Sequence, residues 1–213
     1  MSIIIDRRGV IAGAAAFGAA LGTGLIGGAR PALAQDAGAE GPGTFFLGSE
    51  DAPVHVIEYA SLTCPHCANF HRDVLPRLRE DYIDEDLVRF EYREVYFDRL
   101  GLWGGMLARC NDGMRYFGII GLLFERQAEW ARADTAPEAI AEMRRIGAQA
   151  GLTEAQMDEC MQDAEMAEAL VAQYQSHMAE HEIGGTPSFV IDGELTGNMS
   201  YEDFSSRIEA ALE

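Results

Sequence analysis

The sequence predicts an α/β fold that is interrupted by a lobe made only of helices. Apolar runs rich in β-forming residues occur before residue 100 and after residue 182, and a helical pattern follows in each part. Between them, residues 100–182 are rich in Ala, Glu, Met, Leu, Gln and Arg, with helix caps at Thr135 and Thr153 and nothing typical of a strand. The expected order is therefore strand, strand, helix and strand, then the helical lobe, then strand, strand and helix.

Three strands and one helix are expected before the lobe. Residues 44–47 start an edge strand, and residues 53–60 form a buried strand because their apolar residues run continuously. From residue 64 to residue 82, apolar side chains recur every four residues, as one face of a helix requires, and Pro76 should bend or break this helix. The next strand falls at residues 87–97, where apolar and charged side chains alternate.

Two strands and a closing helix are expected after the lobe. A strand at residues 186–191 is followed by an Asp-Gly turn signal at 192–193 and by a short strand at 194–196. Pro187 is acceptable at the start of a buried strand because it can take the first position or carry a cis peptide bond. Apolar residues at helical spacing predict the last helix over residues 201–212.

An export signal is expected at the N-terminus. Arg7 and Arg8 precede 21 uncharged residues, of which 14 are Gly or Ala, and a small-x-small cleavage pattern ends at Ala34. This run is weakly apolar for a permanent membrane anchor. We expect cleavage to remove residues 1–34 and to leave a flexible Pro/Gly-rich tail at residues 35–43. The paired arginines resemble a twin-arginine signal, and a general secretory signal is the alternative.

The chain is strongly acidic. It carries 16 Arg, no Lys and 35 Asp or Glu, for a formal net charge of −19. Removal of residues 1–34 takes away three Arg and one Asp, which leaves 13 Arg against 34 acids, a net charge of −21. Because such a surface repels phosphate backbones and anionic lipids, nucleic acid is not an expected partner.

The chemistry is expected at Cys64-Pro65-His66-Cys67, which lies directly after a strand and opens a helix. A Cys-x-x-Cys in this position is typical of a redox centre with one reactive thiolate. The free N–H groups and the dipole at the helix N-terminus favour negative charge on Cys64, and Pro65 suits the first helical turn because it has no N–H to leave unpaired. His66 can add positive charge and a donor beside it.

Two other groups of residues are candidate metal ligands. Cys110 and Cys160 lie far apart and form no second Cys-x-x-Cys, which argues against structural zinc. In an oxidising compartment we expect them to form a structural disulfide, and the alternative is two separate buried thiols. His177 and His181 stand four residues apart without an evident third ligand, so we interpret them as surface residues on a polar helix face. No metal site is expected.

A carboxylate interrupts the buried strand before the motif. Glu58 lies six residues ahead of Cys64. A carboxylate inside such a strand is costly unless it is paired or functional. We hypothesise that Glu58 tunes the two thiols or relays protons for them. The alternative is a carboxylate that reaches solvent at the end of the strand.

Together, these features resemble the DsbA-type thiol–disulfide oxidoreductases. The resemblance rests on Cys-Pro-His-Cys at residues 64–67, Glu58, the helical insertion, and Gly-Thr-Pro-Ser-Phe at residues 185–189. It covers residues 44–213. It implies a thioredoxin fold with an inserted all-helical lobe: a thioredoxin-like domain at residues 44–99 and 183–213, and an inserted helical domain at residues 100–182.

The resemblance also implies roles for residues of the motif and of the later loop. Cys64 would be the nucleophile, Cys67 the buried resolving partner, and His66 the residue that makes the disulfide oxidising. Pro187 would be a cis-proline that faces the cysteines. Thr186 stands before this proline where Val is common in the family, and both residues would contact the substrate.

The function implied by the resemblance is a periplasmic oxidase that donates its disulfide to exported proteins. Its partners would be reduced or unfolded exported proteins and a DsbB-like membrane protein that reoxidises it, with no cofactor. A monomer is expected, because relatives that isomerise disulfides generally dimerise through an added segment and only nine loose residues precede this fold. The alternatives are a disulfide isomerase or reductase, a peptide-binding chaperone, and a metal-binding module.

Overall fold

The structure, a computed structural model, describes residues 42–213, which lie within one compact unit and contain a five-stranded sheet. The strands are β1 (Phe45–Leu47), β2 (Val54–Ala60), β3 (Val88–Glu94), β4 (Ser188–Ile191) and β5 (Glu194–Gly197). Their order across the sheet is β1-β3-β2-β4-β5, and β2 and β3 are parallel while the other pairs are antiparallel. The five predicted strands are confirmed, and β1 lies at an edge. The export signal lies outside the described residues, as does most of the tail predicted at residues 35–43.

The strand predicted at residues 87–97 is shorter than expected. β3 ends at Glu94, which pairs with Ala60, the last residue of β2. Beyond Ala60 the neighbouring strand has turned away, so only Val95 still donates a backbone hydrogen bond to it. The alternating pattern continues in the sequence, but no strand partner remains for it.

Pro76 breaks the first long helix, as predicted. The segment divides into α1 (Pro65–Asp73), α2 (Leu75–Leu78) and a π-helical turn, η1 (Arg79–Ile83). The break falls two residues before the proline, because its ring crowds the preceding turn and disfavours helical geometry just ahead of it. The last helix, α9 (Tyr201–Leu212), has the predicted bounds.

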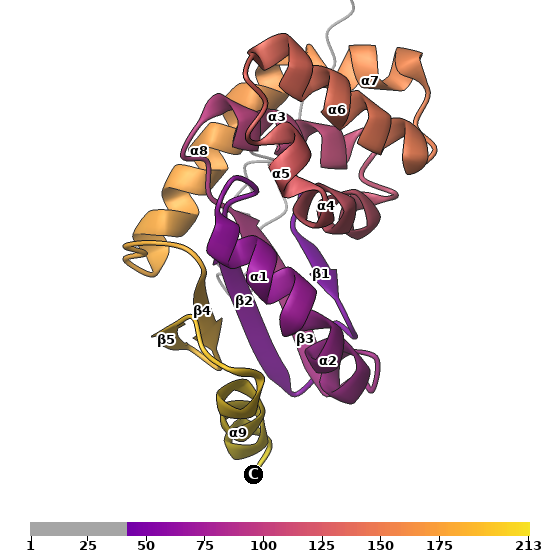
Figure 1. The fold of residues 1–213 in the computed structure, drawn as a ribbon. Helices are drawn as coiled ribbons and strands as arrows, with labels where there is room; N and C mark the ends of the chain where they lie inside the picture. The colour runs from indigo at the N-terminus through magenta and orange to yellow at the C-terminus, as the bar shows by residue number, and fades with distance from the viewer. Residues whose placement is uncertain (1–41) are drawn as a thin grey trace, which may run out of the picture. The chain divides into compact units, whose positions relative to one another are not determined.

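Helices cover both faces of the sheet (Figure 1). On one face, β2 and β3 pack against α1, α2 and α9 around Phe70, Phe189 and Phe204. On the other face, Ile57 and Tyr59 pack against α8. Because side chains alternate along a strand, neighbouring residues of β2 serve these two different cores.

Six helices and no strand lie between β3 and β4 in the described chain. They are α3 (Arg99–Arg109), α4 (Tyr116–Glu125), α5 (Gln127–Trp130), α6 (Ala136–Gln149), α7 (Glu154–Met161) and α8 (Ala164–Glu180). Thr135 and Thr153 each close a capping box at the start of a helix, as the sequence predicts. Cys110 and Cys160 are joined by a disulfide, with their Cα atoms 5.3 Å apart, so the alternative of two separate thiols is wrong.

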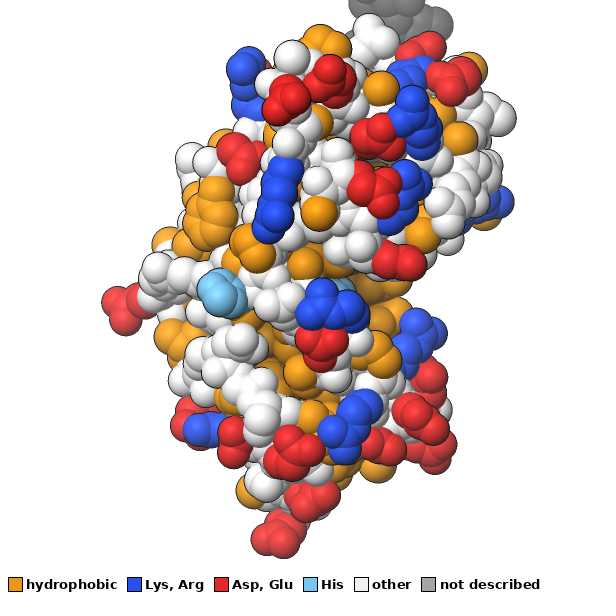
Figure 2. All heavy atoms as spheres, viewed as in Figure 1, with side chains coloured by type: hydrophobic (Ala, Val, Ile, Leu, Met, Phe, Trp, Pro, Cys, Tyr) orange, Lys and Arg blue, Asp and Glu red, His pale blue; other side chains and the backbone are white. Residues whose placement is uncertain are grey.

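The predicted fold class is therefore confirmed: an α/β thioredoxin fold with an inserted all-helical lobe. Within residues 42–213, no helix is both long enough and apolar enough to cross a membrane. Figure 2 shows one face of the molecule, with Asp and Glu side chains gathered around α9 at one end and hydrophobic side chains gathered across the middle.

Candidate active site at the start of helix α1

Cys64 and Cys67 occupy the first turn of α1, directly beyond the end of β2. Cys64 is the N-cap residue, with extended backbone geometry, and Pro65 follows in the first turn. Cys67 is fully buried and Cys64 is 9% exposed. Both are thiols in this structure. The helix therefore begins at the sulfur that remains accessible and hides the other one turn later.

The two thiols have opposite acidities. The pKa of Cys64 falls from 9.0 to about 5, chiefly because the Cys67 thiol donates a hydrogen bond to its sulfur, with further contributions from Thr186 and from the backbone N–H groups of Cys67 and His66. The pKa of Cys67 rises well above its usual value, because its proton is held by Cys64, its thiol is buried, and the negative charge of Glu58 lies nearby. At pH 7, Cys64 is thus a thiolate by roughly a hundred to one, while Cys67 keeps its proton.

The loop before β4 faces the reactive sulfur. The Thr186 carbonyl oxygen lies 3.5 Å from Cys64 Sγ, and the Thr186–Pro187 peptide bond is cis. The Thr186 hydroxyl is buried and makes no hydrogen bond within the described chain, so it is available to donate to the thiolate. A hydrogen bond from Thr186 to the Cys64 thiolate lowers the pKa of Cys64. The structure thus brings together Cys64 and Thr186, two residues 122 positions apart.

Glu58 lies completely buried on β2, so the alternative in which its carboxylate reaches solvent is wrong. One carboxylate oxygen, Oε2, is 2.8 Å from Nε2 of His71, and the other, Oε1, has no partner in the described structure. Burial raises the pKa of Glu58, and the neighbouring His71 opposes this shift in part. Because its pKa is raised, this buried carboxyl holds a proton more readily than an exposed glutamate does.

His66 is exposed beside the motif, and its side chain makes no hydrogen bond or ion pair with any described residue. The backbone N–H of His66 helps to lower the pKa of Cys64, as one of the unpaired donors at the helix N-terminus. The predicted effect of a positive imidazole on Cys64 stays a prediction. The backbone of His66 thus contributes to the site, and its exposed imidazole can contact solvent or a bound chain.

Two contacts to the site were not predicted from the sequence, one from the inserted lobe and one from the residue that precedes α3. Gln127, at the start of α5, donates hydrogen bonds from Nε2 to the carbonyl oxygens of Leu62 and Cys64, at 2.7 and 2.9 Å. Asp98 caps α3 and accepts a hydrogen bond from the Thr63 hydroxyl at 2.8 Å. Both residues lie far from the motif in sequence, and no local pattern distinguishes them from surface polar residues.

His177 and His181 do not form a metal site. Among the described residues, no group of three or more His, Cys, Asp or Glu is arranged to hold a metal ion. His181 lies 2.7 Å from the buried Tyr59 hydroxyl, through Nδ1, and His177 is half-buried. The prediction that both face solvent on a polar surface is therefore wrong, because the end of α8 packs on the sheet.

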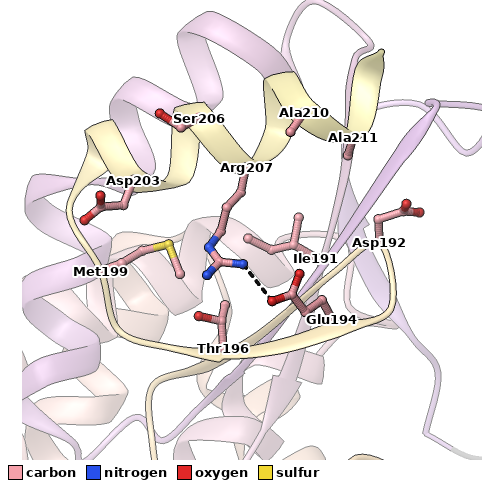
Figure 3. Close-up of a pocket in the computed structure, with 10 residues that line it drawn as sticks. All are labelled: Ile191, Asp192, Glu194, Thr196, Met199, Asp203, Ser206, Arg207, Ala210 and Ala211. Atoms are coloured by element: carbon pink, nitrogen blue, oxygen red, sulfur yellow. Dashed lines mark hydrogen bonds and ion pairs between the residues drawn. The ribbon is translucent and has the colours of Figure 1, made fainter.

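A separate hollow lies between the β4–β5 hairpin and α9 (Figure 3). Arg207 crosses it to form an ion pair with Glu194, at 3.0 Å. Neither the Cys64–Cys67 motif nor the Thr186 loop contributes a residue to its lining, so it is not part of the candidate active site.

The geometry suits thiol–disulfide exchange. An accessible thiolate with a low pKa is both a nucleophile and a good leaving group, and a buried thiol three residues later can displace whatever is bound to it. The fold and this site define a thioredoxin-type protein with a redox-active pair of cysteines.

Comparison with known proteins agrees with this class. The family model described as thioredoxin matches residues 40–210, so the chain belongs to the thioredoxin family, as a DsbA-type member. The crystal structure of Wolbachia pipientis alpha-DsbA1 is similar, with a TM-score of 0.73 and 27% identity, over 80% of this chain and 91% of that one. BdbD from Bacillus subtilis shares the fold, with a TM-score of 0.67 and 22% identity, over 78% of this chain and 91% of that one.

A Rickettsia bellii protein that carries the provisional name of protein-disulfide oxidoreductase is 30% identical over 168 residues. The match covers 78% of this chain and 64% of that protein, so this chain spans less than two thirds of its length.

Proposed function

We propose that this protein is a periplasmic dithiol oxidase, which donates the Cys64–Cys67 disulfide to exported proteins. The observation that carries the proposal is the low pKa of Cys64, about 5, beside a Cys67 that keeps its proton. A stabilised thiolate favours the reduced form of the enzyme, so its disulfide is a strong oxidant. The export signal predicted at residues 1–34 supports a location where disulfides persist.

The reaction proceeds through a mixed disulfide. A client thiolate attacks Cys64, the more accessible sulfur, and Cys67 leaves. A second client thiolate then attacks the client sulfur of the mixed disulfide, and Cys64 departs as its stabilised thiolate. The client gains a disulfide and the enzyme keeps two electrons. Thr186 and Pro187 lie beside Cys64, where they would contact the client chain.

The proposed partners follow from this chemistry. Reduced or unfolded exported proteins supply electrons, and a DsbB-like membrane protein accepts them from the reduced enzyme, as the family resemblance implies. The strongly acidic surface, with a net charge of −19 over the full chain, does not favour nucleic acid.

Redox equilibration with glutathione tests the proposal. The protein is incubated across a range of ratios of reduced to oxidised glutathione, alkylated, and read by mass. We expect a potential near −120 mV, the range of strong oxidants, rather than near −270 mV, the range of thioredoxin-like reductants. A potential at the reducing end would overturn the oxidase in favour of a reductase. Replacement of His66 by Gly should lower the potential, and an unchanged potential would count against a role of the His66 imidazole in making the disulfide oxidising.

An isomerase is the second candidate, and the Thr186 that precedes Pro187 is the residue that keeps it in view. A scrambled-disulfide substrate distinguishes the two activities, because an oxidase acts on reduced substrate and leaves scrambled bonds in place. The mass in solution from light scattering provides an independent measurement, since a monomer is expected for the oxidase.

A further inference from the structure

His71 links the buried carboxylate to the surface. It lies on α1, four residues after Cys67, so both side chains project from the same side of the helix. Its Nε2 atom is 2.8 Å from Glu58 Oε2, and the side chains are 6% and 0% exposed. The imidazole stacks on the Phe124 ring of α4, with centroids 4.0 Å apart. A hydrogen bond and a stacked ring together hold this imidazole in one orientation.

The outer side of His71 faces a hollow in the surface. The hollow lies between the α1–α2 segment and α4, has a volume of about 580 Å³, and includes His71 in its wall. Its other walls are mostly apolar and include Leu75, Phe117 and Phe124. Figure 2 shows hydrophobic side chains at the indentation between these elements. His71 therefore lies between an open hollow on one side and a fully buried carboxyl on the other.

The chemistry of Cys67 requires such a connection. When Cys67 attacks a mixed disulfide on Cys64, the Cys67 thiol must lose a proton, although burial raises its pKa. When a client opens the Cys64–Cys67 disulfide, Cys67 leaves as a thiolate and must gain one. Cys67 has no exposed surface through which water could exchange this proton. The negative charge of Glu58 helps to raise the pKa of Cys67, so this buried carboxyl is close enough to the thiol to act on it.

We propose that His71 is the proton outlet of the active site, and that it passes protons between Glu58 and water in the hollow beside α4. This inference rests on the proposed function. In the resolution step, the Cys67 proton moves to the Glu58 carboxylate and then to His71, which releases it to water. The Cys67 thiolate forms the bond to Cys64, and the displaced thiolate leaves with the electron pair. In the reverse direction the same groups return a proton to Cys67. His71 never touches the reacting sulfurs, so it is a positioning and proton-transfer residue.

The groups around the pair leave this path open. From β3, the fully buried Tyr92 faces the His71 ring, and burial raises the pKa of Tyr92, so the phenol stays neutral. At the N-cap of α1, the negative charge of Cys64 also helps to raise the pKa of Glu58. Three charged residues line the hollow, Arg72, Arg79 and Glu125. Arg72 is held by Asp73 and Arg79 by Asp84, so neither arginine is committed to Glu58.

The chain contains a matched control for this pair. His55, on the same strand as Glu58, pairs with the buried Glu91 at 3.0 Å, between Nε2 and Oε2. Residues 55 and 58 differ by an odd number, so their side chains project to opposite faces of the sheet. His55→Gln therefore removes an imidazole from a His–Glu pair that has no access to the cysteines.

The test follows two steps of one reaction. The reduced full-length protein is mixed with oxidised glutathione, quenched with acid and read by mass. Formation of the mixed disulfide depends on Cys64, and its resolution depends on Cys67. We expect His71→Gln to slow resolution by at least about tenfold, as general acid–base contributions do, and to leave formation unchanged. The resolution rate of the variant should also depend less on pH than that of the parent. His55→Gln should change neither step.

Added imidazole provides a readout that a purely structural role would not move. In His71→Ala, imidazole can enter the space left beside Glu58 from the hollow, and it should restore resolution in proportion to its concentration. Resolution by His71→Gln at the parent rate and with the parent pH profile would overturn the inference. An absence of imidazole rescue would likewise count against proton transfer. The redox potential against glutathione tests the proposed oxidase function separately. The proton-transfer role of His71 can be disproved while the protein is still a strong oxidant.

Discussion

The two cysteine pairs of this protein have the same side chains and opposite chemical settings. Cys64 and Cys67 open α1, where backbone N–H groups lack partners and point toward sulfur. Cys110 follows the last residue of α3 and Cys160 lies near the end of α7, where the unpaired backbone groups are carbonyls. One pair meets donors that stabilise a thiolate, and the other meets acceptors that do not.

The spacing of the pairs separates them as well. The Cys64–Cys67 disulfide would close a loop within one helical turn, so its formation restricts little of the unfolded chain. The Cys110–Cys160 disulfide closes a loop with a sequence separation of 50 and ties α3 to α7. Loop closure of that size restricts the unfolded chain far more. The position of each cysteine in its helix and the separation of the two partners therefore distinguish a reactive pair from a pair that stabilises the fold.

Substitutions in the two pairs should affect different properties: activity for Cys64–Cys67 and stability for Cys110–Cys160. This is the largest difference that we expect. Cys64→Ala should abolish oxidation of a reduced dithiol peptide, since no other thiolate can form the mixed disulfide. The double variant Cys110→Ala/Cys160→Ala should retain peptide oxidation, but lose up to about 4 kcal/mol of the free energy of unfolding by the chain-entropy model. Peptide oxidation followed by fluorescence and urea unfolding of the oxidised proteins measure the two effects. Loss of oxidation in the double variant of a folded protein would contradict this division.

The Cys64 thiolate should also make the free energy of unfolding depend on pH in the reduced protein but not in the oxidised protein. The pKa of Cys64 falls from 9.0 in the unfolded chain to about 5 in the folded one. The stabilisation is complete above pH 9 and is lost as the pH falls toward 5, because the unfolded chain then binds the proton that the folded thiolate does not. Allowing for solvent screening of a partly exposed group, we expect the reduced form to gain about 2–3 kcal/mol over the oxidised form between pH 5 and pH 8.

Urea unfolding of the oxidised and reduced proteins at matched pH values measures this difference. Reduced Cys64→Ala is the control, and its stability should follow that of the oxidised parent across the same range. An equal pH dependence in all three samples would mean that Cys64 ionises like an ordinary cysteine.

The surroundings of the Cys64–Cys67 pair could be predicted from the sequence better than contacts between distant segments. Local patterns predict this pair: a strand before it, Pro65 in the first turn, and apolar residues at helical spacing after it. The fold class, the five strands and the interruption at Pro76 follow from the same kind of short-range information. Hydrophobic periodicity and helix caps act over a few residues, which is why these predictions agree with the structure.

Contacts between distant segments could not be predicted in this way. The partner of Glu58 is His71, on another element, and the sequence shows only that a buried carboxylate needs some partner. The polar sequence of α8 predicts a surface position for His181, but this residue at the helix end contacts the buried Tyr59 hydroxyl. In both cases tertiary packing decides which polar group is buried, and a helix pattern does not report what lies against it.

Gln127 connects the two settings, because it belongs to the inserted lobe but hydrogen-bonds to the loop that carries Cys64. Its replacement should have the smallest effect of the substitutions considered. Its Nε2 donates to two buried carbonyl oxygens, those of Leu62 and Cys64, on the loop that positions the nucleophile. Gln127→Ala leaves both acceptors without a donor, which should lower the free energy of unfolding by about 1–2 kcal/mol.

The same substitution should also slow peptide oxidation several-fold, because the loop that sets the direction of Cys64 is no longer held from the lobe. Gln149→Ala is the matched control, since that amide is exposed and accepts only a 3.4 Å contact from Arg126. If Gln127→Ala lowers stability and leaves the oxidation rate unchanged, the lobe supports the fold without shaping the reactive site. If both quantities fall together and the control is silent, the lobe that carries the structural disulfide also helps to position the reactive one.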